Sequence, residues 1–258
     1  FALRINRWRE QCGDKITLWL DSVGEVEALL ALANFAYENP QGHFPHFVSK
    51  PKGLAGRQLG HPLLAAHQRV CNDIRLDAQR QMLIVSGSNM SGKSTYLRTV
   101  GVNVVLAQAG SIVLAESLTL SPLWLGATMD VHDSIQEGKS KFYAEISKIK
   151  SIIDLADEAQ QAGENVLFLL DELLHGTNSI DRKKGASLII DAFLHKAAFG
   201  MITTHDLVLT QSQQDVIHNV HFTDEFNGTE LHFDYTLREG VVTHSNAMQI
   251  IKNVGIGL

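Results

Sequence analysis

The sequence predicts an α/β fold in which a mainly parallel sheet is flanked by helices, and three observations support this prediction. First, apolar stretches of strand length alternate with helical patterns from residue 60 onward, which is typical of layered α/β domains. Second, residues 166–170 are five consecutive apolar residues, as expected for a parallel strand that is buried on both faces. Third, a glycine-containing loop at residues 87–95 separates the apolar stretch Met82–Ser86 from a helical pattern that begins near Lys93.

The first fifty residues have a different pattern from the rest of the chain. Apolar residues recur at helical spacing over residues 16–37, and we expect Gly24 to bend or split that helix. Asn39-Pro40 then ends it. We therefore expect a short N-terminal helical stub with a connector over residues 1–50, and the main α/β domain over residues 51–258.

The same patterns place the remaining elements. Helices are expected at residues 93–109, 141–162, 185–196 and 245–253. Strands are expected at residues 111–114, 117–120, 201–204, 231–237 and 241–243, with a turn at 238–240 between the last two.

The composition narrows the class of protein. Apolar residues make up 45% and charged residues 19%, which is ordinary for a globular protein with a core. The net charge of −6 argues against binding a nucleic-acid backbone over the whole surface.

Cys12 and Cys71 form no CxxC pair, which argues against a disulfide scaffold or zinc site and favours a reducing compartment. No membrane-spanning run or signal peptide is visible, so we expect a cytoplasmic location without membrane contact from this chain. Because the chain opens on Phe1 rather than Met, we expect it to be part of a longer protein.

The loop at residues 87–95 fits the phosphate-binding pattern G-x-x-x-x-G-K-[ST] at every position. Its glycines let the backbone curl so that successive N–H groups point at a phosphate, and the following helix adds the positive end of its dipole. Lys93 is expected to contact the β- and γ-phosphates, and the Ser94 hydroxyl to ligate Mg²⁺. The alternative is a glycine-rich turn that binds no nucleotide. The expected ATP-binding residues of the loop are Gly87, Ser88, Asn89, Met90, Ser91, Gly92, Lys93, Ser94 and Thr95.

Polar residues follow two of the predicted strands. Asp171 and Glu172 end the strand at 166–170, which delivers them to the edge of a parallel sheet where ligands bind. We expect Asp171 to hold Mg²⁺ with Ser94, and Glu172 to polarise the attacking water. His205 ends the strand at 201–204 and can reach the γ-phosphate or that water. The expected catalytic residues are Glu172, His205 and Lys93, and the alternatives are solvated acids and a structural histidine.

These motifs resemble the ATPase domain of the MutS mismatch-repair proteins, which belong to the ABC-type ATPases with a P-loop. The similarity rests on Asn89-Met90 inside the loop, Asp171-Glu172, Gly176-Thr177 and Thr204-His205. It extends over most of the chain through Gly60-His61-Pro62, Asn72-Asp73-Ile74 and Gly110-Ser111. The resemblance implies that the chain hydrolyses ATP, and that the helix over residues 28–37 is the base of the family's lever.

The resemblance also implies a site shared between two subunits. Residues 138–145 match the family's signature segment, so Ser140 is expected to cap the γ-phosphate of a second copy in trans. An ordinary helix N-cap is compatible with the same serine. Asn178 and Asp181 would lie along the contact between the subunits of this homodimer.

Several positions depart from the repair enzymes and suggest a divergent MutS-like branch. Residues 173–178 and the segment Phe142-Tyr143-Ala144-Glu145 differ from the usual family sequence. The aromatic residue that stacks on adenine is replaced near Arg69-Val70. We expect Val70 and Tyr235 to bind the adenine, and Arg69 is an alternative stacking partner.

Three functions are compatible with these residues. The first is the ATPase of a MutS-like repair protein that binds mismatched DNA through upstream domains, in which the dimer closes around ATP and drives conformational change. No Phe here is followed two residues later by Glu, so the family's mismatch-reading wedge is not in this chain. The second is a MutS-like ATPase outside mismatch repair, acting on recombination intermediates or anchored to a membrane by upstream sequence. The third is a nucleotide switch without turnover, against which the complete set of expected site residues counts.

Overall fold

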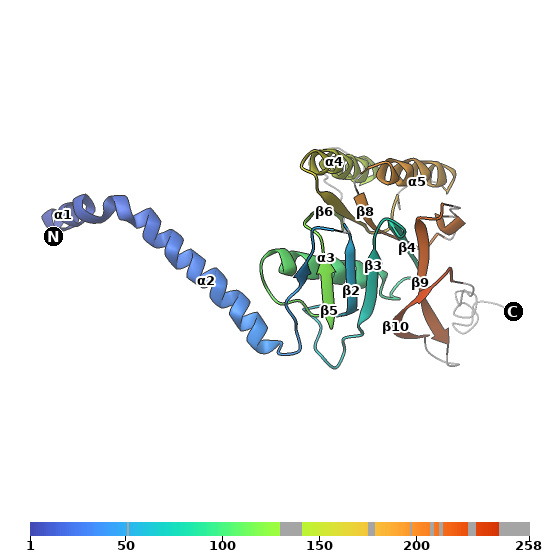
Figure 1. The fold of residues 1–258 in the computed structure, drawn as a ribbon, viewed down its shortest axis with the longest axis horizontal. Coiled ribbons are helices and arrows are strands. Elements are labelled where there is room, and N and C mark those ends of the chain that lie inside the picture. Colours follow the sequence, from blue (N-terminus) through green and yellow to red (C-terminus); the bar gives the residue numbers. More distant parts are fainter. Residues whose placement is uncertain are drawn as a thin grey trace.

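The computed structural model describes residues 1–50, 52–129, 141–174, 179–196, 198–206, 209–211, 214–226 and 231–242. Among the described residues, two sheets and three α-helices form the main body of the molecule, and two further α-helices extend away from it (Figure 1). The larger sheet has the order β10-β9-β4-β8-β7-β6, and the smaller has the order β1-β5-β2-β3. The strands are β1 His46–Phe47, β2 Leu54–Leu59, β3 Asn72–Leu76, β4 Met82–Ser86, β5 Ser117–Leu120, β6 Leu123–Thr128, β7 Asn165–Leu170, β8 Ala198–Thr204, β9 Ile217–Phe226 and β10 Leu231–Glu239.

The larger sheet is buried at its centre because helices cover both of its faces. Leu83 and Val85 of β4 pack in one apolar cluster with helix α3 (Lys93–Gln108). Met82 and Ile84 face the other way and pack with helices α4 (Lys141–Gln161) and α5 (Ser179–Leu194), which lie side by side in Figure 1. Both faces of β4 are therefore apolar, which explains why all five of its residues are buried.

The pairing of the strands is mixed in both sheets. In the larger sheet β9, β4, β8, β7 and β6 pair in parallel, and β10 pairs antiparallel with β9. In the smaller sheet β1 and β5 are parallel, whereas β2 pairs antiparallel with both β3 and β5. The expectation of one mainly parallel sheet was therefore incomplete, because it missed the smaller sheet, whose apolar residues complete the core around α3.

The N-terminal helices α1 (Ala2–Cys12) and α2 (Ile16–Glu38) are joined by a short helical turn, η1 (Gly13–Lys15). Neither helix has a buried residue, and both extend away from the sheets (Figure 1). The expectation that Gly24 splits the helix was wrong, since α2 continues through it without a break, and a bend there stays a prediction. Among the described residues, no helix has the length and apolar character needed to cross a membrane.

Other predicted elements agree with the structure in part. β4, α3, β5, α4 and β7 lie within a residue or two of their predicted bounds. Residues 111–114 are not a strand and contain a single bridge from Val113 to His43. Residues 238 and 239 continue β10 instead of forming a turn, and 241–242 are not a strand. The start of α5 and the strands β2, β3, β6 and β9 were missed, and the helix expected at 245–253 lies outside the described residues.

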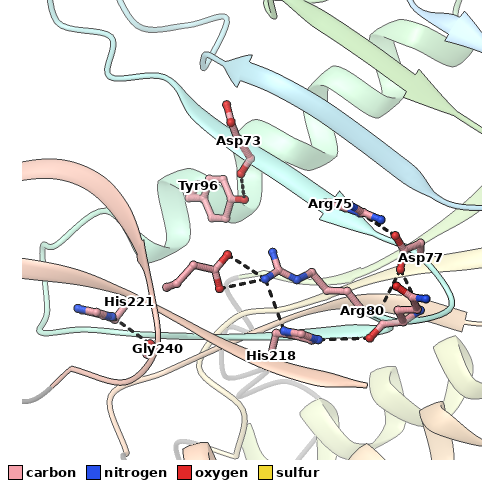
Figure 2. Close-up of polar contacts among 10 residues, drawn as sticks. Asp73, Arg75, Asp77, Arg80, Tyr96, His218, His221 and Gly240 are labelled. Carbon is pink, nitrogen blue, oxygen red and sulfur yellow. Dashed lines mark hydrogen bonds and ion pairs between the residues drawn. The ribbon is translucent and has the colours of Figure 1, made fainter. Parts of the chain in front are cut away.

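An ion pair joins the edge strand β10 to the segment that precedes β4. Arg80 Nη2 lies 2.8 and 2.9 Å from the two carboxylate oxygens of Glu239, and 3.4 Å from His218 Nδ1 (Figure 2). Asp77 accepts hydrogen bonds from the backbone N–H groups of Gln79 and Arg80 at 2.8 and 3.0 Å, which closes the turn before Arg80. A single nitrogen contacts both oxygens and the Glu239 side chain is largely exposed, so this ion pair adds only modestly to the strand pairing that places β10 beside β9.

Candidate functional site

The loop between β4 and α3 depends on two glycines. Gly92 has φ +105° and Gly87 has φ +150°, values that residues with side chains rarely adopt. A Cβ at Gly92 would also lie 3.1 Å from the Tyr235 ring, and one at Gly87 would lie 3.0 Å from the Phe222 carbonyl oxygen. The loop can therefore have this shape only with glycine at both positions.

Lys93 is enclosed by the loop. Its side chain is only 4% exposed, and Nζ donates to the carbonyl oxygens of Gly87 at 3.0 Å and Ser88 at 2.7 Å. Burial lowers the pKa of Lys93, and the nearby carboxylates of Glu172 and Asp171 act in the opposite direction. The loop thus holds a buried ammonium group, whose positive charge suits an anion.

The predicted metal ligands Ser94 and Asp171 lie together. The Ser94 hydroxyl, in the first turn of α3, donates to Asp171 Oδ1 at 2.9 Å, and Thr203 Oγ1 donates to the same oxygen at 2.6 Å. Within the described part of the chain, no group of three or more His, Cys, Asp or Glu side chains could hold a metal ion. A hydroxyl and one carboxylate suit Mg²⁺, which keeps several waters and takes further ligands from phosphates.

Glu172 and His205 follow β7 and β8, but the structure places them differently. Glu172 has φ +49°, its backbone N–H donates to Thr203 Oγ1 at 2.8 Å, and it lines the same cavity as Lys93. His205 is exposed and is not among the described residues that line this cavity. The structure therefore brings Glu172 to the loop, and it leaves the role of His205 a prediction.

The cavity above the loop has a volume of about 710 Å³, within the range of small-molecule sites. Lys93, Ser94 and Glu172 all line this cavity. The predicted loop residues Asn89, Met90, Gly92 and Thr95 line it as well. One cavity therefore adjoins most of the residues that the loop pattern singled out.

Val70 and Tyr235 line the same cavity although they lie far apart in the sequence. Val70 is 41% exposed and Tyr235 is 43% exposed, so both residues have free surface for the aromatic ring of a ligand. The alternative that Arg69 stacks on the base stays a prediction, since its Nη2 donates to the Leu64 carbonyl oxygen at 2.7 Å and Arg69 is not among the described residues that line the cavity. Tyr235 is an exposed aromatic residue of this cavity, whereas Tyr96 and Phe222, which also line it, are buried.

Two cavity residues that we did not assign support the walls of the site. The Tyr96 hydroxyl, on α3, donates to the Asp73 carbonyl oxygen at 2.7 Å (Figure 2). Burial raises the pKa of Tyr96, so the hydroxyl stays protonated as a donor. His61 Nδ1 accepts from the Leu63 backbone N–H at 3.2 Å, and burial, together with the charges of two nearby arginines, lowers its pKa. The Tyr96 contact has no local sequence signal, because its partner Asp73 lies 23 residues away, whereas the His61 contact is made with a residue two positions along the chain.

The groups that line the cavity decide whether a phosphate-bearing ligand fits. Ser88 Oγ and Ser91 Oγ are buried and have no hydrogen-bond partner among the described residues, but neither serine lines the cavity. Lys93 and Ser94 do line it, and Asp171 is hydrogen-bonded to Ser94. A cation beside a hydroxyl–carboxylate pair fits a phosphate-bearing nucleotide with Mg²⁺.

Some predicted residues lie outside the described part of the chain. These are Ser140, Gly176-Thr177 and Asn178. Asp181 lies in the first turn of α5 and is exposed.

The fold and the site together define an α/β protein with a cavity beside the glycine-containing loop that follows the parallel strand β4. A family model described as MutS domain V matches residues 83–257, more than half of the chain. The chain therefore belongs to the MutS family, and the match covers the family's ATPase domain.

Proposed function

We propose that this chain is the ATP-hydrolysing domain of a MutS-like DNA mismatch-repair protein, with the fold of a P-loop NTPase of ABC type over residues 51–258. The observation that carries the proposal is the common cavity of Lys93, Ser94 and Glu172, with Asp171 hydrogen-bonded to Ser94. A cation, a hydroxyl–carboxylate pair and a second carboxylate are the groups that phosphoryl transfer to water requires.

Each group has a separate task in this proposal. The loop N–H groups and Lys93 bind the β- and γ-phosphates, and Val70 and Tyr235 enclose the adenine. Ser94 and Asp171 hold Mg²⁺, which neutralises charge on the phosphates when bound. Glu172 orients and polarises the attacking water, and His205 contacts the γ-phosphate after the site closes.

The proposal includes a homodimer. Ser140 of a second copy caps the γ-phosphate, so that ATP binding favours a closed pair of ATPase domains. The helices α1 and α2 extend away from the sheets and have no buried residue, which suits a mechanical connection to DNA-engaging domains upstream. ATP-driven closure would then move those domains.

The substitution Glu172→Gln tests the proposal because it removes the carboxylate charge and keeps the shape of the side chain. We expect ATP binding by calorimetry to be retained, turnover to fall by about 100-fold or more, and a dimer to accumulate in light scattering. Glu25→Gln, at an exposed position of α2, is the matched control and should hydrolyse ATP normally.

The outcomes separate the alternatives. Unchanged turnover in Glu172→Gln removes this residue from the mechanism. Wild-type protein that binds ATP and never hydrolyses it supports a switch without turnover. Wild-type protein that gives no heat with ATP and Mg²⁺ contradicts the proposal entirely.

A further inference from the structure

The turn that carries Glu172 has an unusual backbone. Glu172 has φ +49° and Leu174 has φ +58°, so two residues with side chains adopt the left-handed region within three positions. That region is unfavourable for residues other than glycine, and Leu174 is fully buried. A conformation of this kind persists only when the surrounding structure holds it.

Side chains from two other elements hold this turn. The backbone N–H of Glu172 donates to Thr203 Oγ1 at 2.8 Å, and the backbone N–H of Leu174 donates to Glu145 Oε1 at 2.7 Å. Thr203 is fully buried on β8, and Glu145 is 7% exposed on α4. Each left-handed residue therefore has its amide fixed by a buried side chain that is distant in the sequence.

The Thr203 hydroxyl contacts both acidic residues of the site, Asp171 through its carboxylate and Glu172 through its backbone N–H. It has one proton, which it donates to Asp171 Oδ1 at 2.6 Å, and its lone pair accepts the Glu172 amide. Ser94 donates to the same Oδ1 atom, so Oδ2 is the Asp171 oxygen that neither hydroxyl uses. One buried hydroxyl thus sets the orientation of Asp171 and the backbone position of Glu172.

Glu145 ties the same turn to α4. A buried carboxylate that accepts a backbone N–H makes a stronger hydrogen bond than a neutral acceptor does. Leu174 follows Glu172 by two residues, so the position of α4 constrains the path of the chain directly after the second carboxylate.

We propose that Thr203 and Glu145 are positioning residues that hold the turn at residues 171–174 in the conformation in which Glu172 can act on water. This inference rests on the proposed ATP hydrolysis. It predicts a selective loss of turnover, since neither side chain lines the cavity where the nucleotide would bind.

Four variants of the intact protein test it by kinetics at saturating Mg²⁺. Thr203→Val keeps the shape and removes the hydroxyl, whereas Thr203→Ser keeps the hydroxyl. Glu145→Ala removes the acceptor, whereas Glu145→Gln keeps an amide oxygen. We expect Thr203→Val, which removes two hydrogen bonds, and Glu145→Ala, which removes one, each to lower kcat by about tenfold, or about 1.4 kcal/mol. The Kd for ATP should change less than about threefold, and the Ser and Gln variants should recover most of kcat.

Amide hydrogen exchange gives a second measurement that does not need turnover. We expect Thr203→Val to speed exchange at Glu172, and Glu145→Ala to speed exchange at Leu174, each at its own amide. Thermal melts show whether every variant is folded.

The results distinguish this inference from the proposed function. Wild-type protein that hydrolyses no ATP overturns the proposed function. Unchanged exchange at both amides in the Val and Ala variants overturns the positioning. Unchanged kcat in those variants, or an equal loss in the Ser and Gln variants, overturns the catalytic role of the positioning.

Discussion

The side-chain amide of Asn72 on β3 donates to the Tyr235 carbonyl oxygen on β10 at 2.9 Å. Its oxygen accepts from the Leu237 backbone N–H at 2.7 Å, so one side chain holds both sides of residue 236. Tyr235 has φ +54°, and the pairing of β9 with β10 shifts register between Phe233 and Leu237. Asn72 therefore stabilises an irregular segment of β10, and the Tyr235 ring of this segment lies against Gly92 of the loop between β4 and α3.

Removal of this amide should affect both stability and nucleotide binding. We expect Asn72→Ala to lower the free energy of unfolding by about 2 kcal/mol, because two hydrogen bonds are lost at a nearly buried position. The Kd for ATP should rise, since Tyr235 is no longer held over the loop. Urea unfolding and calorimetry measure the two effects. Asn34→Ala, at an exposed position of α2, should change stability by less than about 0.5 kcal/mol, and an equal effect in both variants would contradict the assignment.

Two glycines should respond in opposite ways to alanine. A Cβ at Gly200 would lie 2.0 Å from the Phe168 carbonyl oxygen, where the backbone of β7 cannot yield easily. We expect Gly200→Ala to destabilise the protein by about 3 kcal/mol through overpacking. A Cβ at Gly24 on α2 would meet nothing within 4 Å, and Gly24→Ala should stabilise that helix by about 0.5 to 1 kcal/mol. Denaturant unfolding followed by circular dichroism would refute this if Gly200→Ala proved neutral.

His61 should make the folded protein sensitive to mild acid. Burial, with the charges of Arg98 and Arg69, holds the pKa of His61 below its ordinary value of 6.5. The unfolded chain therefore binds the proton first, so the stability that neutral His61 contributes is complete above pH 6.5 and is lost as the pH falls below it. We expect the melting temperature of the wild type to fall more between pH 7 and pH 5 than that of His61→Gln. Parallel melting curves for the two proteins across this range would show that His61 does not contribute.

Mixing two inactive variants should restore part of the activity if the site is shared between subunits. Lys93→Met removes the phosphate-binding cation, and Ser140→Arg blocks the residue offered in trans. Each variant alone should be inactive, whereas a mixed dimer has one intact site, so an equal mixture should regain up to about one quarter of wild-type turnover. Light scattering must show that mixed dimers form. Mixed dimers without any recovery would argue for a site complete within one subunit.

Local patterns explain which parts of the fold could be predicted from the sequence. The β4–loop–α3 unit was predictable because its glycines, Lys93 and flanking apolar residues are adjacent in the chain. β7 was predictable as an uninterrupted apolar run. β2 was not, because Gln58 at φ +51° interrupts its alternation and leaves the burial pattern irregular.

No local sequence pattern indicated the residues that support the site. Thr203 contacts groups 31 and 32 residues away, and Asn72 contacts groups 163 and 165 residues away. Their chemistry is ordinary for polar residues in strands, and only the folded arrangement gives them a role. For Arg69 the sequence did give a signal, since its position suggested that it stacks on the adenine. In the structure its guanidinium group donates a hydrogen bond to the Leu64 backbone carbonyl oxygen.

The strand that leads into the loop, β4, pairs with β8 on one side and β9 on the other. Both partner strands lie more than a hundred residues later in the chain. At ribosomal rates of about 5–20 residues per second, they are synthesised on the order of ten seconds after β4. During that interval a complete glycine loop exists without the sheet that supports it. Under the proposed function, the capacity to bind ATP is thus acquired late in synthesis, and a truncation before β8 should abolish it while leaving every loop residue in place.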